Sequence, residues 1–176
     1  EMHGYVEPCG CTAGQTGGLA RRATLIEQLQ QQRGWNVVGL DLGGTMISDR
    51  VDRQQTNLKF ELARDALESM GFVSLGVGYE EARPRQDYLL ALSDRDKAIE
   101  NYGLRLTSAN VRPYPDDPDL DITQLYRVIE VPAKAGAKPF RIVVTSVLGT
   151  TASQGIGNDL FFKILPPAEA LAEILP

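Results

Sequence analysis

The sequence has few of the residues that build metal centres or disulfide frameworks. Its 176 residues include one histidine and two cysteines, Cys9 and Cys11. A disulfide between cysteines only two positions apart would close a very small and strained ring. We therefore expect no disulfide framework. The lone histidine, His3, limits how many imidazole ligands the chain can offer to a metal ion.

Positive charge and long apolar runs are also scarce. The chain has 18 Lys and Arg against 23 Asp and Glu, which gives a formal net charge of −5. Such a chain lacks the basic surface that attracts nucleic acids and anionic membranes, so we expect no nucleic-acid partner. Apolar stretches such as residues 140–148 fall far short of the roughly 20 residues that a spanning helix needs. We expect no membrane span in this chain.

The first half of the chain alternates between helical and extended patterns. With 43% apolar residues, the chain can bury one core, so a single domain is the default expectation. Apolar residues at helical spacing predict helices over 19–34, 56–70 with Thr56 as N-cap, and 86–102. Short apolar runs predict a buried strand over 35–42 and further strands over 72–75 and 104–111. Strands that alternate with crossover helices favour a mainly parallel sheet.

The second half has a different pattern. Prolines and aspartates predict an exposed loop over 112–121. Two apolar segments, 125–131 and 140–148, predict an antiparallel hairpin. A loop over 149–158 then leads to an extended segment, 160–165, and to a short helix opened by a proline pair. The predicted class is α/β, with a mainly parallel sheet and an added antiparallel hairpin.

The start of the chain carries the most specific pattern. Residues 4–8 read Gly-Tyr-Val-Glu-Pro, and residues 17–26 read Gly-Gly-Leu-Ala-Arg-Arg-Ala-Thr-Leu-Ile. This closely resembles the start of the 5'-nucleotidase branch of the calcineurin-like metallophosphoesterases, in which a glycine pair and Leu-Ala-Arg open the first helix. Later segments follow in that family's order: 40–44, 75–80, 108–111, 147–151 and 162–170. The resemblance implies a metallophosphoesterase-like layered fold over 1–176, as a single but incomplete domain, a fragment of a longer one.

The motifs that would hold that family's metals are altered. A two-metal phosphoesterase needs carboxylates and imidazoles at strand ends, so that cations about 4 Å apart can clamp a phosphoryl group and activate water. By comparison with the family, Gly44 replaces the bridging aspartate, and Val77 and Gly78 replace an asparagine and a histidine. None of these three side chains can bind a metal. The family's dinuclear site therefore cannot be assembled from this sequence alone.

Other ligands remain near the N-terminus. Glu1 and His3 stand where the family has Asp-x-His, and a Pro-Cys-Gly-Cys segment adds Cys9 and Cys11. Thiolates and imidazole suit zinc or copper. The candidate metal residues are thus Glu1, His3, Cys9 and Cys11, with zinc, manganese or copper as the ion. The alternative, that the cysteines are free or partner-bonded thiols without a metal, stays open.

Two further groups of carboxylates are expected to be structural. Asp41 follows a strand, and aspartates at such positions often accept hydrogen bonds from loop amides. Glu80 and Glu81 lie close in sequence to Arg83 and Arg85, and exposed charges of this kind pair only weakly. We expect a solvated, charged loop there.

Three functions follow from these patterns. The first is a catalytically degenerate 5'-nucleotidase-like domain, with no catalytic residues assigned, that acts as a binding or assembly module. The second is an active metal-dependent phosphoester or nucleotide hydrolase completed by other segments. The third is a thiol-based metal or redox site at Cys9 and Cys11. The Pro-Cys-Gly-Cys variant resembles that of exported bacterial proteins found alongside multihaem cytochromes, which implies a periplasmic or extracellular location and a multihaem cytochrome as protein partner.

Overall fold

The computed structural model describes residues 2–8, 14–46, 53–83, 86–113, 121–133, 138–156 and 162–175. The α-helices are α1 (Leu19–Glu27), α2 (Arg53–Ser69), α3 (Gln86–Ala98), α4 (Thr150–Ile156) and α5 (Pro167–Ile174), and one π-helical turn, η1 (Gln28–Gln32), extends α1. The strands are β1 (Gly39–Asp41), β2 (Phe72–Gly76), β3 (Arg105–Thr107), β4 (Val111–Pro113), β5 (Arg127–Val131), β6 (Phe140–Val144) and β7 (Phe162–Ile164).

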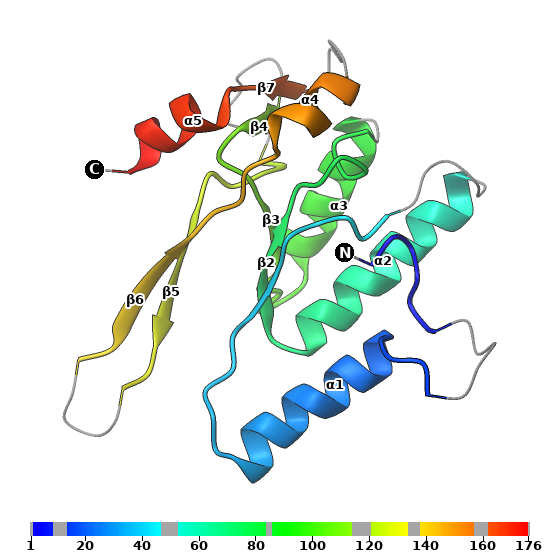
Figure 1. Ribbon diagram of the computed structural model, residues 1–176, viewed down its shortest axis with the longest axis vertical. Helices are drawn as coiled ribbons and strands as arrows, with labels where there is room; N and C mark the ends of the chain where they lie inside the picture. The colour runs from blue at the N-terminus through cyan, green and yellow to red at the C-terminus, as the bar shows by residue number, and fades with distance from the viewer. Residues whose placement is uncertain are drawn as a thin grey trace.

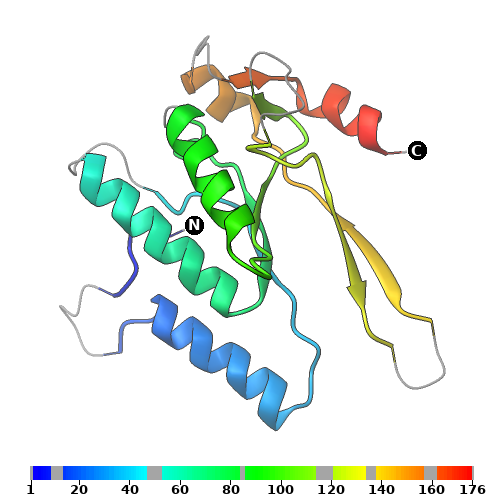
Figure 2. The same ribbon diagram turned by 180° about the vertical axis from the view of Figure 1, so that it is seen from behind.

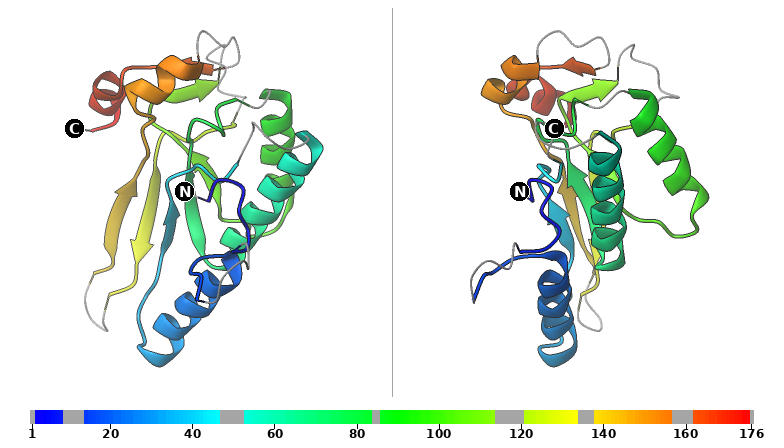
Figure 3. Two further views of the ribbon diagram at one scale, coloured as in Figure 1. Left: turned by 45° about the vertical axis from the view of Figure 1, so that its right-hand side comes forward. Right: turned by 90° about the vertical axis from the view of Figure 1, so that its right-hand side faces the viewer.

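A parallel sheet in the order β1-β2-β3 forms the centre of the fold, as the alternation of helices and strands predicts. In its register Leu75 pairs with Asp41 on one side and with Leu106 on the other. Helices α2 and α3 lie along one side of this sheet (Figures 1 and 3). The carboxyl ends of its strands therefore meet at one edge, where ligand sites of open α/β sheets form.

The predicted antiparallel hairpin is confirmed in β5 and β6, which pair from Arg127 with Val144 to Val131 with Phe140. This hairpin forms an arm on the side of the fold away from α2 and α3 (Figures 1 and 2). It is tied to the rest of the fold where Asn36 donates to the Pro132 carbonyl at 3.3 Å and Arg127 donates to the Gly103 carbonyl at 3.0 Å. The segment before it joins the parallel sheet, because Gln124 pairs with Thr107 in parallel. A further antiparallel pair, β4 with β7, completes the strands that the structure describes.

The core lies between the parallel sheet and the two long helices. Helical spacing places Phe60, Ala63 and Leu67 on one face of α2, and all three are at most 1% exposed. Phe60 and Leu67 belong to a cluster of buried apolar side chains that includes Leu75, Leu89, Leu104, Leu106 and Val111. No helix in the described part of the chain is both long and apolar enough to span a bilayer.

Several predicted elements differ from those observed. Helix α2 begins at Arg53, so Thr56 lies inside its first turns and is not the N-cap. The third helix ends at Ala98 and not at residue 102, because the chain turns at Asn101, whose φ is +64°. The predicted strand 104–111 is divided into β3 and the start of β4, which pair in different sheets. Part of the predicted loop 149–158 forms helix α4.

The predicted buried strand over 35–42 is wrong in both length and burial. Only Gly39–Asp41 forms a strand, and it pairs with one neighbour, β2. The apolar side chains of this segment are largely exposed to solvent: Trp35 is 54% exposed, Leu40 46% and Leu42 81%. The run of apolar residues indicated burial on both faces, but a strand at the edge of a sheet is covered only where other elements pack on it.

Candidate functional site

Three segments converge at the carboxyl edge of the parallel sheet. The N-terminal segment binds the turn after β1 through its backbone: the amides of Met2 and His3 both donate to the Gly44 carbonyl, at 2.9 and 2.7 Å, and the Gly4 amide donates to the Thr45 carbonyl at 2.9 Å. The turn after β2, residues 76–81, meets the same region. Because both strands run parallel, these segments, distant in sequence, are brought to one place.

A buried carboxylate connects the two turns. The Glu81 side chain is fully buried. Its Oε1 accepts hydrogen bonds from the Thr45 amide at 2.7 Å, the Thr45 hydroxyl at 2.6 Å and the Met46 amide at 3.1 Å. Its Oε2 accepts from the Gly44 amide at 2.9 Å and the Gly78 amide at 3.0 Å. Five donors occupy the roughly four lone-pair positions of a carboxylate, so its acceptor capacity is saturated.

The prediction of a solvated loop at Glu80 and Glu81 is therefore wrong: Glu81 is fully buried, and the Glu80 side chain is only 18% exposed. Adjacent residues point in different directions, and here one of the two points into the protein. Glu80 lies 3.9 Å from the guanidinium of Arg83, in the weak pairing that the sequence indicates. Arg83 also lies over the ring of Tyr79, 5.3 Å from its centroid.

The two turns approach so closely that side chains are excluded at their glycines. A Cβ at Gly78 would lie 2.7 Å from both Glu81 Oε2 and the Gly44 nitrogen, and a Cβ at Gly43 would lie 2.6 Å from the Gly78 nitrogen. Gly43 and Gly44 also have φ of +94° and +68°, which disfavour any residue with a Cβ. The backbone contact between the turns thus requires glycine.

Asp41 has the structural role expected from its position. Its Oδ1 accepts a hydrogen bond from the Gly43 amide at 3.1 Å, and its Oδ2 pairs with Arg22 at 3.1 Å. The Arg22 guanidinium also lies 5.7 Å from the centroid of the Phe72 ring. Asp41 therefore links helix α1 to the end of β1.

A second pair of segments meets through Asn110, which is fully buried. Its amide group donates to the carbonyls of Leu148 and Leu165 at 2.9 and 3.1 Å, and its Oδ1 accepts from the Leu148 amide at 2.8 Å. The segments 108–111 and 147–151, which follow the family's order in the sequence, are thus neighbours in space. The carboxamide is used by the backbone and is structural.

Between α2 and α3 lies a polar network that the sequence patterns above do not predict. Arg64 pairs with Asp96, and Arg95 bridges Asp96 at 2.9 Å and Asp65 at 2.8 Å. Burial raises the pKa of Tyr102, whose hydroxyl donates to Asp65 at 3.3 Å, to about 12. The sequence did hold a signal: Asp96 follows Leu92 by four residues and Leu89 by seven, and therefore lies on the buried face of its helix.

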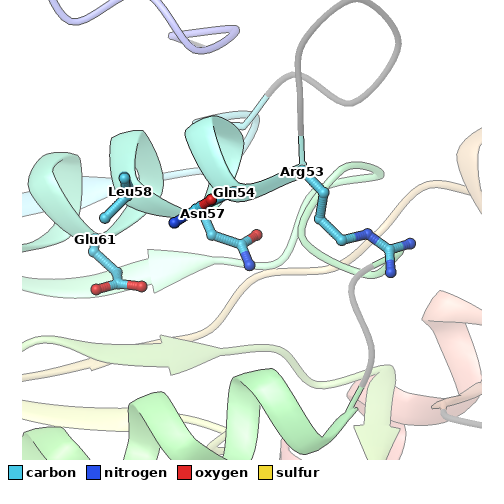
Figure 4. Close-up of a pocket in the computed structure, with 5 residues that line it drawn as sticks. All are labelled: Arg53, Gln54, Asn57, Leu58 and Glu61. Carbon is cyan, nitrogen blue, oxygen red and sulfur yellow. The ribbon is translucent and has the colours of Figure 1, made fainter.

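A surface depression of about 520 Å³ lies on α2 and is lined by Arg53, Gln54, Asn57, Leu58 and Glu61 (Figure 4). All five residues come from one helix. Its one carboxylate, Glu61, already interacts with the Tyr88 hydroxyl at 3.3 Å and with Arg95 at 3.9 Å. The depression brings together no groups from different elements, so we do not regard it as a catalytic site.

Of the four candidate metal residues, the structure describes only His3. Glu1, Cys9 and Cys11 lie outside the described residues. His3 is exposed and has a φ of +47°, which is uncommon for a residue with a Cβ. Within the described ranges, no group of three or more His, Cys, Asp or Glu side chains is arranged to hold a metal ion. The site at Glu1, His3, Cys9 and Cys11 stays a prediction.

Comparison with known proteins establishes the fold. No family model and no curated protein matches the sequence. Among solved structures, the chain is similar to the 5'-nucleotidase precursor from Thermus thermophilus, with a TM-score of 0.70, 21% identity, and coverage of 99% of this chain and 32% of that one. The chain has a metallophosphoesterase-like fold.

A second solved structure with this fold is the NAD nucleotidase from Haemophilus influenzae, with a TM-score of 0.65 and 16% identity. The match covers 99% of this chain and 30% of the NAD nucleotidase chain. The chain therefore spans about a third of the length of both structures. The resemblance read from the sequence is confirmed for the fold.

The metallophosphoesterase-like fold implies divalent metals at the strand ends, and the two described turns do not fit them. A cation needs lone pairs on oxygen, nitrogen or sulfur. The turns instead direct four amide N–H groups and one hydroxyl at a single point, which Glu81 occupies. Gly78, which the resemblance aligns with a metal ligand of the family, has no space for a side chain.

Proposed function

We propose that this chain is a catalytically degenerate metallophosphoesterase-like domain that acts as a binding or assembly module. The observation that carries the proposal is the direct contact of the turns after β1 and β2 around the Glu81 carboxylate. A phosphoester hydrolase of this fold requires charged or imidazole ligands at the same place. Three of those positions hold Gly44, Gly78 and Val77, the last of which is 3% exposed.

Electrostatics supports the same proposal. Amide and hydroxyl donors carry partial positive charge and stabilise an anion. A divalent cation placed among the donors from Gly44, Thr45, Met46 and Gly78 would be repelled by them, and Glu81 has no free lone pair left to compensate. The arrangement therefore favours a structural role for these turns over metal-assisted hydrolysis.

The binding role rests on the exposed apolar side chains of the hairpin. On one face of the arm, Phe140 is 68% and Ile142 46% exposed, and on the other Val143 is 59% and Val128 40% exposed. Exposed apolar side chains that are grouped in this way are candidates for an interaction site. The arm lies on the side of the fold away from α2 and α3 in Figures 1 and 2.

The test of degeneracy is hydrolysis by the native polypeptide that contains this chain. We expect no metal-dependent hydrolysis of 5'-AMP or NAD after addition of manganese or zinc. The matched control is a His3→Ala variant, which removes the chain's one imidazole. Metal-dependent hydrolysis that is lost in this variant would refute the proposal and support the active hydrolase.

We also propose, as a separate candidate, a metal site at Glu1, His3, Cys9 and Cys11 that binds one zinc, manganese or copper ion. It is supported by His3, which the Gly44 carbonyl holds at the edge of the sheet. Mass spectrometry of protein purified without chelators would compare wild type with the double variant Cys9→Ser, Cys11→Ser. One bound ion that is lost in the variant supports the site, and equal metal content in both contradicts it.

Location and partner follow as proposals from the sequence resemblance. We propose a periplasmic or extracellular protein that associates with a multihaem cytochrome. The description of the Thermus protein as a precursor agrees with an exported protein. Cell fractionation tests the location, and co-purification of a covalent haem signal with the chain tests the partner. Recovery of the protein only from the cytoplasm would contradict both.

A further inference from the structure

We infer that the turns after β1 and β2 form an anion-binding nest, and that the chain fills this nest with its own carboxylate, Glu81. The donors come from both turns: the amides of Gly44, Thr45 and Met46 and the Thr45 hydroxyl on one side, and the Gly78 amide on the other. All five reach one carboxylate at 2.6–3.1 Å. The ligand class of the nest is a carboxylate.

The backbone conformation explains why the donors converge. Gly43 and Gly44 both have positive φ, +94° and +68°. Successive N–H groups in turns of this kind point into a common concavity that binds anions. Without an anion, the aligned N–H dipoles would repel one another, and buried donors would lack acceptors.

Glu81 also explains why the turns can touch. Burial of an ionised carboxylate is strongly unfavourable unless hydrogen bonds replace its water, and here five donors do so. In return, the carboxylate holds Gly43 and Gly78 so close that neither can carry a Cβ. We assign to Glu81 the role of joining the ends of β1 and β2, which a bound cation would otherwise hold together. Because it is fully buried, it also closes the nest to external anions such as phosphate.

Amide hydrogen exchange measured by NMR tests the first part of this inference. The variant Glu81→Gln preserves the volume of the side chain but directs an NH₂ group at N–H donors. We expect the amides of Gly44, Thr45, Met46 and Gly78 to exchange at least tenfold faster than in wild type. The matched control is Glu80→Gln at the adjacent position, with unchanged rates at those amides. Equal protection in both variants would overturn the inference.

Chemical rescue tests the second part. The variant Glu81→Ala removes the side chain beyond Cβ, and acetate supplies the same carboxylate group. We expect acetate to raise the thermal midpoint of Glu81→Ala by several degrees over the same concentration of chloride. Wild type and Glu80→Ala should show equal midpoints in the two salts.

If Glu81→Ala is unfolded in chloride, the same titration is followed by circular dichroism, and refolding specific to acetate supports the nest. Absence of any acetate-specific effect overturns it. The inference concerns the same turns as the proposed function, but the two fail separately. Metal-dependent hydrolysis lost in His3→Ala would refute degeneracy, whereas equal amide exchange in Glu81→Gln and Glu80→Gln would refute the nest alone.

Discussion

The buried ion pair between α2 and α3 allows a quantitative prediction. Arg64 is 2% exposed and Asp96 1% exposed, and they form a direct salt bridge. Within the described residues, the Nε and Nη1 atoms of Arg64 have no hydrogen-bond partner. Asp96 is therefore the group that compensates the charge of this guanidinium. We consider the substitution Asp96→Leu.

This substitution leaves an uncompensated cation in the core. Removal of one partner of a buried pair costs about 3–5 kcal/mol, against a total stability of about 5–15 kcal/mol for a typical domain. With a urea m-value of about 2 kcal/mol/M, the unfolding midpoint should fall by about 1.5–2.5 M. The measurement is urea unfolding followed by circular dichroism.

Two further variants separate this effect from the change in helix surface. Asp94→Leu removes an exposed carboxylate two positions away, which lies 3.9 Å from Lys97, and should change stability by less than about 1 kcal/mol. The double variant Arg64→Met, Asp96→Leu replaces the pair with apolar groups and should recover most of the loss, because neither charge remains buried. The reasoning is refuted if the double variant loses as much stability as Arg64→Met and Asp96→Leu added together, each measured alone, or if Asp96→Leu is no less stable than Asp94→Leu.

Two other predictions follow from the structure. Gly78→Ala places a Cβ 2.7 Å from Glu81 Oε2 and the Gly44 nitrogen and should lower the free energy of unfolding by about 1–3 kcal/mol. The control is Gly149→Ala, because a Cβ at Gly149 would have nothing within 4 Å. Equal urea midpoints in the two variants would contradict the close contact at Gly78. The pKa of Tyr102 is raised to about 12 in the folded state, above its ordinary value of about 10. The stability that the protonated Tyr102 hydroxyl contributes is therefore complete below pH 10 and is lost as the pH rises towards 12. Urea midpoints across this pH window should fall less steeply in Tyr102→Phe than in wild type, and identical slopes would contradict the assignment.

Much of the fold could be predicted because the deciding signals are local. Helical spacing of apolar residues and terminal glycines located most of α1, α2 and α3, and β-rich segments on either side of residues 132–139 located the hairpin. The errors occur where long-range contacts decide the outcome. The break between β3 and β4 depends on Asn110, whose partners Leu148 and Leu165 are 38 and 55 residues away. No local pattern encodes such contacts.

The candidate site divides in the same way. The sequence alone predicts that Gly44, Val77 and Gly78 supply no metal ligand, because residue identity determines whether a side chain can bind a metal. The role of Glu81 could not be read, since an acidic residue beside Glu80 and Arg83 has the pattern of a solvated loop. Its burial depends on a turn 35–37 residues earlier, which supplies four of its five donors.

The sequence by itself determined the order of α1, α2, α3 and the strands between them, the parallel character of the sheet and the resemblance to the metallophosphoesterases, since each depends on spacing and residue type along the chain. Only the tertiary structure decided which polar groups are buried together. The Glu81 nest, the Arg64–Asp96 pair and the Asn110 contacts each join segments more than 30 residues apart. Their energetics depend on burial, and burial is a property of the folded chain.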